Sequence, residues 1–175
     1  MMNLPKFKYY SNPFNDDVFL KEDIQCICCG KVSAYKYVGW VWGKNEVFGK
    51  ICPWCISNGQ AFTQFGSTFN QIEAADIDDD QKVATLRHCT PGLPTMQELE
   101  WPTHCSDIPL FEGVADKEDL KNISKQQLEE FEEREFLTEE EATDYIATFI
   151  EQDTPMFLKF TCNSCNEKIF KFDFN

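Results

Sequence analysis

The residues best able to do chemistry in this chain are nine cysteines, six of which form three pairs with the spacing Cys-x2-Cys. The first two pairs, Cys26 with Cys29 and Cys52 with Cys55, are separated by 22 residues. Zinc prefers four soft ligands at tetrahedral corners, about 2.3 Å from each sulfur. Two intervening residues let a tight turn direct both sulfurs of a pair at one ion. The spacing therefore predicts a Zn2+ site closed by four thiolates, structural rather than catalytic.

The elements around these pairs must bring them together. Residues 32–42 are rich in β-branched and aromatic residues, residues 43–45 supply a turn, and residues 46–51 can return as a second strand. The second pair then opens a helix with Pro53 in its first turn, where the missing N–H costs little. Knuckle, β-hairpin and helix in this order are typical of a treble-clef or zinc-ribbon-like module. The helix N-terminus also favours thiolate charge.

Two other interpretations of these cysteines stay open. The motif Cys52-Pro-Trp-Cys55 can be a redox-active dithiol at a helix start, which requires a βαβ context with parallel strands. The residues before it indicate an antiparallel hairpin instead, so zinc is favoured. The cysteines can also be plain buried thiols. Cys28, inside the first motif, is interpreted as a spare thiol that can replace one of its neighbours.

A second metal site is predicted from four residues further along the chain. Cys162 and Cys165 lie in the tight turn of a hairpin, as in a zinc knuckle, but this pair needs partners. His104 and Cys105 are the best candidates, provided that the backbone bends sharply there. The 56-residue gap between Cys105 and Cys162 leaves other assignments open.

Those other assignments change the chemistry. His88 or Cys89 can replace a partner, or the His-Cys pair can serve as a helix cap and a core thiol. If only three protein groups bind zinc, water takes the fourth position and hydrolysis becomes conceivable, with Glu98 or Asp107 as the base. Because carboxylates are common throughout the chain, the sequence favours this last interpretation least.

The remaining patterns predict helices, a hairpin and the domain organisation. Capping boxes begin at Ser124 and Thr138, each ahead of apolar residues at helical spacing. Residues 81–88 can form a short helix, and residues 156–161 and 168–174 are typical of two strands. We expect an α+β fold in a single compact domain over residues 1–175. It comprises a zinc module (19–66), an acidic loop (67–80), and a helical segment with the C-terminal hairpin (81–175).

Composition limits the classes of function. Of the 175 residues, 42% are hydrophobic and 14% aromatic, which suffices for a packed core. We find neither an apolar run that could span a membrane nor a signal peptide, so we expect a cytoplasmic protein, whose reducing environment disfavours disulfides. No phosphate loop, hydrolase motif or basic patch is present. The sequence does not indicate an oligomeric state.

Charge also limits the choice of partners. The net charge is −14, which repels phosphate backbones and argues against nucleic-acid binding. Residues 112–153 hold 15 acidic and 4 basic residues, so most of the negative charge lies there. This stretch is either a solvated helical face or a docking surface for a basic protein partner.

At these motifs the chain resembles the CbrC family of bacterial proteins. Asn166 departs from the glycine expected after the last cysteine, although Asn also tolerates the left-handed backbone of a knuckle. His88 and Cys89 lie outside the family's pattern, which favours His104 and Cys105 as ligands. The resemblance covers essentially the whole chain and is carried by residues 4–9, Cys26 to Cys29, Cys52 to Ile56, Gly59, Thr90 to Gly92, Gln97, Glu98, Trp101, His104, Cys105, Asp107, Cys162, Cys165 and an aromatic tail ending near Phe174.

The resemblance implies a bacterial cytoplasmic protein associated with colicin resistance, with no established reaction or substrate. Together with the motifs, it leads us to expect a non-enzymatic, zinc-stabilised interaction protein in stress or toxin tolerance. Its acidic helices would bind a basic protein such as a toxin nuclease domain. The alternative is an enzyme, either a CxxC dithiol oxidoreductase or a zinc-dependent hydrolase.

Overall fold

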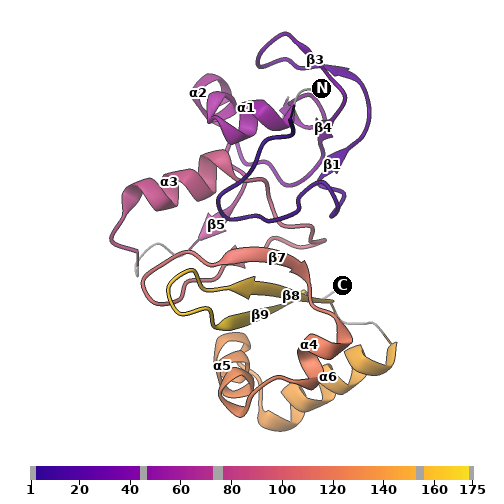
Figure 1. Cartoon of the computed structure of the whole chain (residues 1–175), viewed down its shortest axis with the longest axis vertical. Coiled ribbons are helices and arrows are strands. Elements are labelled where there is room, and N and C mark those ends of the chain that lie inside the picture. Colours follow the sequence, from indigo (N-terminus) through magenta and orange to yellow (C-terminus); the bar gives the residue numbers. More distant parts are fainter. Residues whose placement is uncertain (1–2, 44–46, 73–76, 153–155, 174–175) are drawn as a thin grey trace.

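A computed structural model of the chain describes residues 3–43, 47–72, 77–152 and 156–173. Helices and several small β-sheets are combined in it, which confirms the mixed α+β class. The elements lie in three tiers: a loop-rich N-terminal part, a three-stranded sheet across the middle, and a group of helices at the far end (Figure 1). No helix in the described part of the chain is both long and apolar enough to cross a membrane.

Short strands and two short helices build the N-terminal tier. β1 (Phe19–Leu20) pairs antiparallel with β4 (Lys36–Tyr37), and β2 (Ile24–Gln25) pairs antiparallel with β3 (Val32–Ser33). α1 (Pro53–Ser57) and α2 (Gln60–Phe65) follow. The helix predicted to open at the second cysteine pair is thus confirmed as α1.

The long hairpin predicted over residues 32–51 is replaced by these shorter strands. Ser33 Oγ donates to Tyr35 O at 2.7 Å and accepts from the Tyr35 N–H at 3.2 Å, and this local turn ends β3 after two residues. Residues 47–51 form no strand, yet the Tyr37 N–H donates to Ile51 O at 3.0 Å. Most of the predicted turn at residues 43–45 lies outside the described residues.

A parallel pairing links the N-terminal tier to the middle of the molecule. β5 (Gln71–Ile72) pairs with β6 (Glu100–Trp101), so the stretch expected to be a loop contains a strand. α3 (Asp80–Cys89) lies between them in sequence and confirms the helix expected at residues 81–88. Its N-cap is Asp79, whose carboxylate accepts from two backbone N–H groups.

The middle tier is an antiparallel sheet buried on both faces. Its strand order is β7 (Leu110–Val114), β8 (Met156–Thr161), β9 (Lys168–Asp173), and the last two confirm the predicted C-terminal hairpin. Side chains alternate across the sheet. Leu158 and Phe160 of β8 face the hydrophobic core that includes the N-terminal tier, whereas Phe157 joins a second core beneath the helices.

The helices of the far tier cover that second core. α4 (Lys117–Lys121) and α5 (Lys125–Glu135) begin with capping boxes, and α6 (Glu139–Gln152) follows. Ser124 and Gln127 form the box predicted for α5. Thr138 and Glu141 exchange hydrogen bonds at the start of α6, as predicted. α4, capped by Asp116, was not predicted because its five residues carry no helical periodicity of their own.

Candidate metal centres

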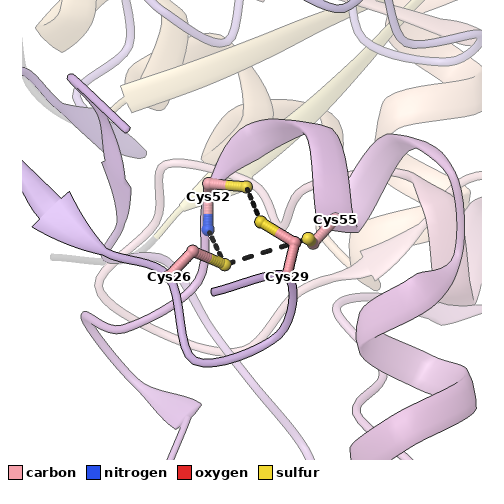
Figure 2. Close-up of side chains that lie close together, drawn as sticks. All are labelled: Cys26, Cys29, Cys52 and Cys55. Atoms are coloured by element: carbon pink, nitrogen blue, oxygen red, sulfur yellow. Dashed lines mark hydrogen bonds between the residues drawn. The ribbon is translucent and has the colours of Figure 1, made fainter. Parts of the chain in front are cut away.

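Four cysteine sulfurs converge between the first knuckle and the start of α1 (Figure 2). Cys26 Sγ lies 3.8 Å from Cys55 Sγ, and Cys29 Sγ lies 3.9 Å from Cys52 Sγ. All four sulfurs are within 4.8 Å of one another. A tetrahedron with zinc–sulfur bonds of about 2.3 Å has edges of about 3.8 Å. The spacing of the sulfurs therefore fits one tetrahedral ion at their centre.

Local backbone structure places these four side chains. Cys26 and Cys29 lie in the turn between β2 and β3, where the Gly30 N–H donates to Cys26 O at 2.8 Å. Cys52 is the N-cap of α1 with extended backbone, and its own N–H donates to Cys26 Sγ at 3.3 Å (Figure 2). Because Pro53 opens the helix, Cys55 falls one turn later and faces the same point.

The four thiols of this cluster have no positively charged group among them, and their pKa values shift in opposite directions. Hydrogen bonding from the Cys52 thiol, followed by contacts from backbone N–H groups, lowers the pKa of Cys26 to about 4 against the effect of burial. The pKa of Cys52 is raised, first by its hydrogen bond to Cys26 and then by burial, and burial raises that of Cys55. The charged form of Cys26 is thus favoured, whereas Cys52 and Cys55 stay protonated. A divalent cation would reverse this and stabilise all four charges.

A glutamine contacts the cluster although no sequence pattern predicts this role for it. Gln60, at the start of α2, accepts from Cys55 Sγ at 3.6 Å and donates to Cys28 O at 3.4 Å. It therefore links α2 to the second ligand pair and to the knuckle. The Cys28 sulfur is buried but is not a member of the cluster. A polar residue at a helix start gave no sequence signal for this role.

A second cluster forms at the turn that joins β8 to β9. It consists of His104, Cys105, Cys162 and Cys165, whose ligand atoms lie within 4.8 Å of one another. Cys105 Sγ is 3.8 Å from Cys165 Sγ, and His104 Nδ1 is 3.6 Å from the same sulfur. Three sulfurs and one imidazole nitrogen are a ligand set that zinc uses in closed sites.

The sharp bend that this arrangement needs is present between His104 and Asp107. The two residues exchange backbone hydrogen bonds at 3.0 and 3.1 Å, and Cys105 and Ser106 between them both have φ of 52°. Left-handed backbone at two consecutive non-glycine residues costs free energy, and such strain is concentrated at functional sites. It allows two adjacent residues to offer ligands to one point.

The Asp107 carboxylate stabilises this bend through hydrogen bonds to neighbouring groups. It accepts from Lys82 Nζ at 2.7 Å and from the Ile108 N–H at 2.8 Å. Although burial opposes the shift, hydrogen bonding from Lys82 lowers the pKa of Asp107. An ion-paired, hydrogen-bonded carboxylate is a weak base, so this geometry disfavours Asp107 as the base of a hydrolase.

The two Cys-x2-Cys turns have the same backbone hydrogen bonds. In the first, Cys26 N–H donates to Lys31 O and Gly30 N–H donates to Cys26 O; in the second, the equivalent bonds join Cys162 to Glu167 and Asn166 to Cys162, all between 2.8 and 3.0 Å. Gly30 has φ of 70° and Asn166 has φ of 63°. Asn166 therefore takes the left-handed conformation that the sequence analysis expected of it.

The two clusters differ in exposure and in their thiol chemistry. The first is mostly buried, whereas Cys105 and Cys165 of the second are exposed and Cys162 is buried. Against the effect of burial, hydrogen bonds from His104 and backbone N–H groups lower the pKa of Cys162 to about 6. Hydrogen bonding to Cys165 raises the pKa of Cys105 to about 11.

The alternative ligands lie elsewhere. The His88 ring stacks on Phe62 with ring centroids 3.5 Å apart, and Cys89 Sγ packs close to Gly59. Neither belongs to a cluster of ligand atoms among the described residues. The physical reason is that α3 directs both side chains toward α2 rather than toward the knuckle of β8 and β9.

Comparison with known proteins finds a family model and several relatives that match this chain. A family model described as "Uncharacterised protein family (UPF0167)" matches residues 4–174. UPF0167 proteins of Mycobacterium bovis and Mycobacterium tuberculosis are each 30% identical over 123 residues, covering 69% of this chain and 65% of theirs. The matched part thus spans less than two thirds of these curated relatives. A UPF0167 protein of Pseudomonas aeruginosa is 27% identical over 182 residues, covering 98% of this chain and 97% of its own. No solved structure matches.

These findings correct the resemblance drawn from the motifs. The matching family model and the curated relatives are UPF0167 proteins, so the assignment to the CbrC family was wrong. The expected association with colicin resistance depended on that assignment and has no support. Short cysteine motifs recur in unrelated proteins, and their order along a chain does not by itself identify a family.

Asn166 provides a test of the knuckle geometry. We expect Asn166→Gly to keep the thermal midpoint of unfolding or raise it slightly, since glycine adopts positive φ without a steric penalty. We expect Asn166→Val to destabilise the protein by about 1–2 kcal/mol, because a β-branched side chain is strained there. Thermal unfolding followed by circular dichroism measures both. Equal stability of the two variants would contradict a left-handed residue at this position.

Proposed function

We propose that this chain, which belongs to the uncharacterised protein family UPF0167, is a non-enzymatic binding protein whose fold is held by two structural zinc ions. The observation that carries the proposal is the convergence of four sulfurs at 3.8–3.9 Å contact distances in the first cluster. The second cluster adds three sulfurs and an imidazole. Cys26, Cys29, Cys52 and Cys55 would hold one ion, and His104, Cys105, Cys162 and Cys165 the other.

The donor set selects among metals. Soft thiolates with at most one imidazole favour zinc over calcium, magnesium or manganese, which prefer oxygen ligands. Four protein ligands in each cluster would leave no position for a bound water or substrate. This supports structural roles and weakens the hydrolase alternative. The zinc-dependent hydrolase would need three ligands around an open position.

Metal at the first cluster would compensate for sparse secondary structure around it. Strands β1 to β4 contain two residues each, and α1 contains five. Elements of this length are not stable alone, and zinc binding contributes folding free energy directly. The order of knuckle, short strands and ligand-bearing helix supports a treble-clef-like module. One domain over residues 1–175 is supported by β8 and β9, whose side chains enter both hydrophobic cores.

The dithiol oxidoreductase alternative receives less support. Cys52 and Cys55 each have a sulfur partner from the first knuckle, so they are two members of a group of four. The strands nearest to them pair antiparallel, whereas the redox motif requires a parallel βαβ context. A cluster that can bind one ion accounts for all four sulfurs together.

The helices of the far tier present a negatively charged surface that is complementary to a basic protein partner. α5 and α6 carry exposed carboxylates and few cations. The ion pairs there, such as Lys125 with Glu129, neutralise only a small part of this charge. A field of one sign attracts partners of opposite charge and raises their association rate at low salt. Among the residues whose exposure the structure describes, the exposed acidic ones on α5 and α6 are Glu129, Glu133, Glu139, Glu140, Glu141 and Asp144.

Zinc content and variant behaviour test the structural role. We expect native mass spectrometry of freshly purified protein to show two zinc ions per chain. Cys52→Ser should make the chain insoluble or protease-sensitive, because it opens the buried cluster and removes its contribution to folding. Cys165→Ser should leave a folded chain with one zinc, since Cys105 and Cys165 of the second cluster are exposed.

Cys28→Ser is the matched control for this series. Its sulfur is buried and near the first cluster but belongs to neither group of ligands. We expect it to retain two zinc ions and near wild-type protease resistance. Equal tolerance of Cys28→Ser and Cys52→Ser, or wild-type protein purified without metal and with cysteines joined as disulfides, would refute structural zinc.

The charge of the far tier gives a separate test of the binding role. We expect proteins retained by the immobilised chain at about 50 mM salt to be basic and to be released near 0.5 M, as screening shortens the range of the field. A triple variant, Glu139→Gln, Glu140→Gln and Asp144→Asn, should lose them. The variant Asp23→Asn, Asp78→Asn and Glu98→Gln makes the same change of charge elsewhere and should not. Equal loss of the retained proteins in both variants would contradict a binding role for the surface on α5 and α6.

A further inference from the structure

A cavity of about 620 Å³ opens on the N-terminal tier, away from both groups of metal ligands. Three segments line it: residues 16–18, residues 38–41 with Phe48, and residues 93–96. Its volume lies within the range of about 300–1,000 Å³ typical of small-molecule sites. None of the lining residues belongs to either cysteine cluster.

The walls of this cavity are tied together by a buried tyrosine. The Tyr37 hydroxyl donates to Trp40 O at 2.7 Å and accepts from the Gly92 N–H at 2.9 Å, which joins the second segment to the third. A Cβ atom added to Gly39 or Gly92 would lie 2.6 or 3.0 Å from this hydroxyl. Both glycines are therefore required for the close approach.

Two further hydrogen bonds complete the frame. The Trp40 Nε1–H donates to Thr95 O at 3.0 Å, and the Val38 N–H donates to Val18 O at 3.0 Å. Each segment of the wall is thus bonded to another. A cavity framed in this way is largely formed before a ligand arrives, which reduces the entropic cost of binding.

The surface chemistry of the cavity combines aromatic rings with acid. Trp40 is 39% exposed, Phe48 57% and Met96 77%, so large apolar side chains gather at one opening. Asp16 and Asp17 line the same space, and none of the described lining residues is Lys, Arg or His. Burial raises the pKa of Asp16, and a bound cation would favour its charged form.

We propose that this cavity binds a small organic cation, an ammonium group carrying an apolar or aromatic substituent. The apolar part would lie against Leu93 and Met96, and the ammonium would lie between the Asp17 carboxylate and the faces of Trp40 and Phe48. Aromatic rings attract cations through their quadrupole, most strongly at tryptophan. The net charge of −14 raises the local concentration of such a ligand further.

A series of three 2-phenylethyl probes that differ only in their end group, an ammonium, a hydroxyl or a carboxylate, tests the charge preference. The purified chain of residues 1–175 is titrated with 2-phenylethylamine, 2-phenylethanol and 3-phenylpropanoate, and binding is followed by two-dimensional NMR of the backbone amides. We expect the amine to bind about tenfold more tightly than the alcohol, with the largest shifts in the three lining segments, and the carboxylate not to bind.

Two variants and a control localise the site. Asp17 is exposed and has φ of 55°, a conformation that Asn tolerates, so Asp17→Asn removes charge without strain. We expect it to weaken amine binding about three- to fivefold. Phe48→Ala, which removes a mostly exposed ring, should also weaken binding. Asp78→Asn removes the same charge at an exposed position that does not line the cavity and should leave the affinity unchanged.

Several results would overturn the proposal. These are equal affinity for the amine and the alcohol, no saturation with the amine below about 10 mM, or amine binding unchanged in both Asp17→Asn and Phe48→Ala. Since no metal ligand lines the cavity, these outcomes leave the zinc proposal untouched. The zinc proposal is tested by the metal content of the protein, which the titration does not measure.

Discussion

The N-terminal tier depends on the contact of four sulfur atoms that the chain brings together from two distant turns. Around them the regular structure is slight: strands of two residues and a helix of five. Hydrophobic burial contributes through rings such as Phe19 and Tyr37. However, four thiols at such distances, three of them buried, are a poor core on their own, because a thiolate among them lacks a countercharge. An ion at their centre would supply that charge and fix the turn, the strands and α1 relative to one another.

The second cluster repeats the backbone of the first but stands in different surroundings. Both turns share their hydrogen bonds and a left-handed residue after the second cysteine. The first cluster lies under α1 and α2, whereas the second has two exposed cysteines and is attached to a sheet that two hydrophobic cores already support. Under the proposed function the first ion would therefore matter more for folding. The second would mainly fix the bend at His104 to Asp107 against the turn of β8 and β9.

The elements that could be predicted from the sequence are those determined by short, local patterns. Capping boxes at Ser124 and Thr138, the proline after Cys52 and the alternating strands around Cys162 act over a few residues, and the structure has these elements where they were expected. The ligand atoms of both predicted groups also converge. By contrast, the parallel pairing of β5 with β6 and the ion pair of Lys82 with Asp107 join residues far apart in the chain. No local pattern encodes such contacts.

The errors have equally specific causes. The long hairpin over residues 32–51 failed because the Ser33 hydroxyl competes for the backbone at Tyr35, an interaction that strand propensity ignores. Gln60 was missed because its contacts with Cys28 and Cys55 exist only once α1 and α2 are packed. The assignment to the CbrC family is wrong because the order of short motifs does not identify a family, whereas the UPF0167 family model matches residues 4–174.

Zinc K-edge X-ray absorption of the purified protein tests the central claim most directly, because it reports the atoms bound to the metal. With seven sulfurs and one nitrogen shared by two ions, the account predicts an average of about three and a half sulfur ligands per zinc, at about 2.3 Å, with the remainder nitrogen. A spectrum dominated by oxygen and nitrogen neighbours, or metal-free protein that keeps its full thermal stability, would contradict it.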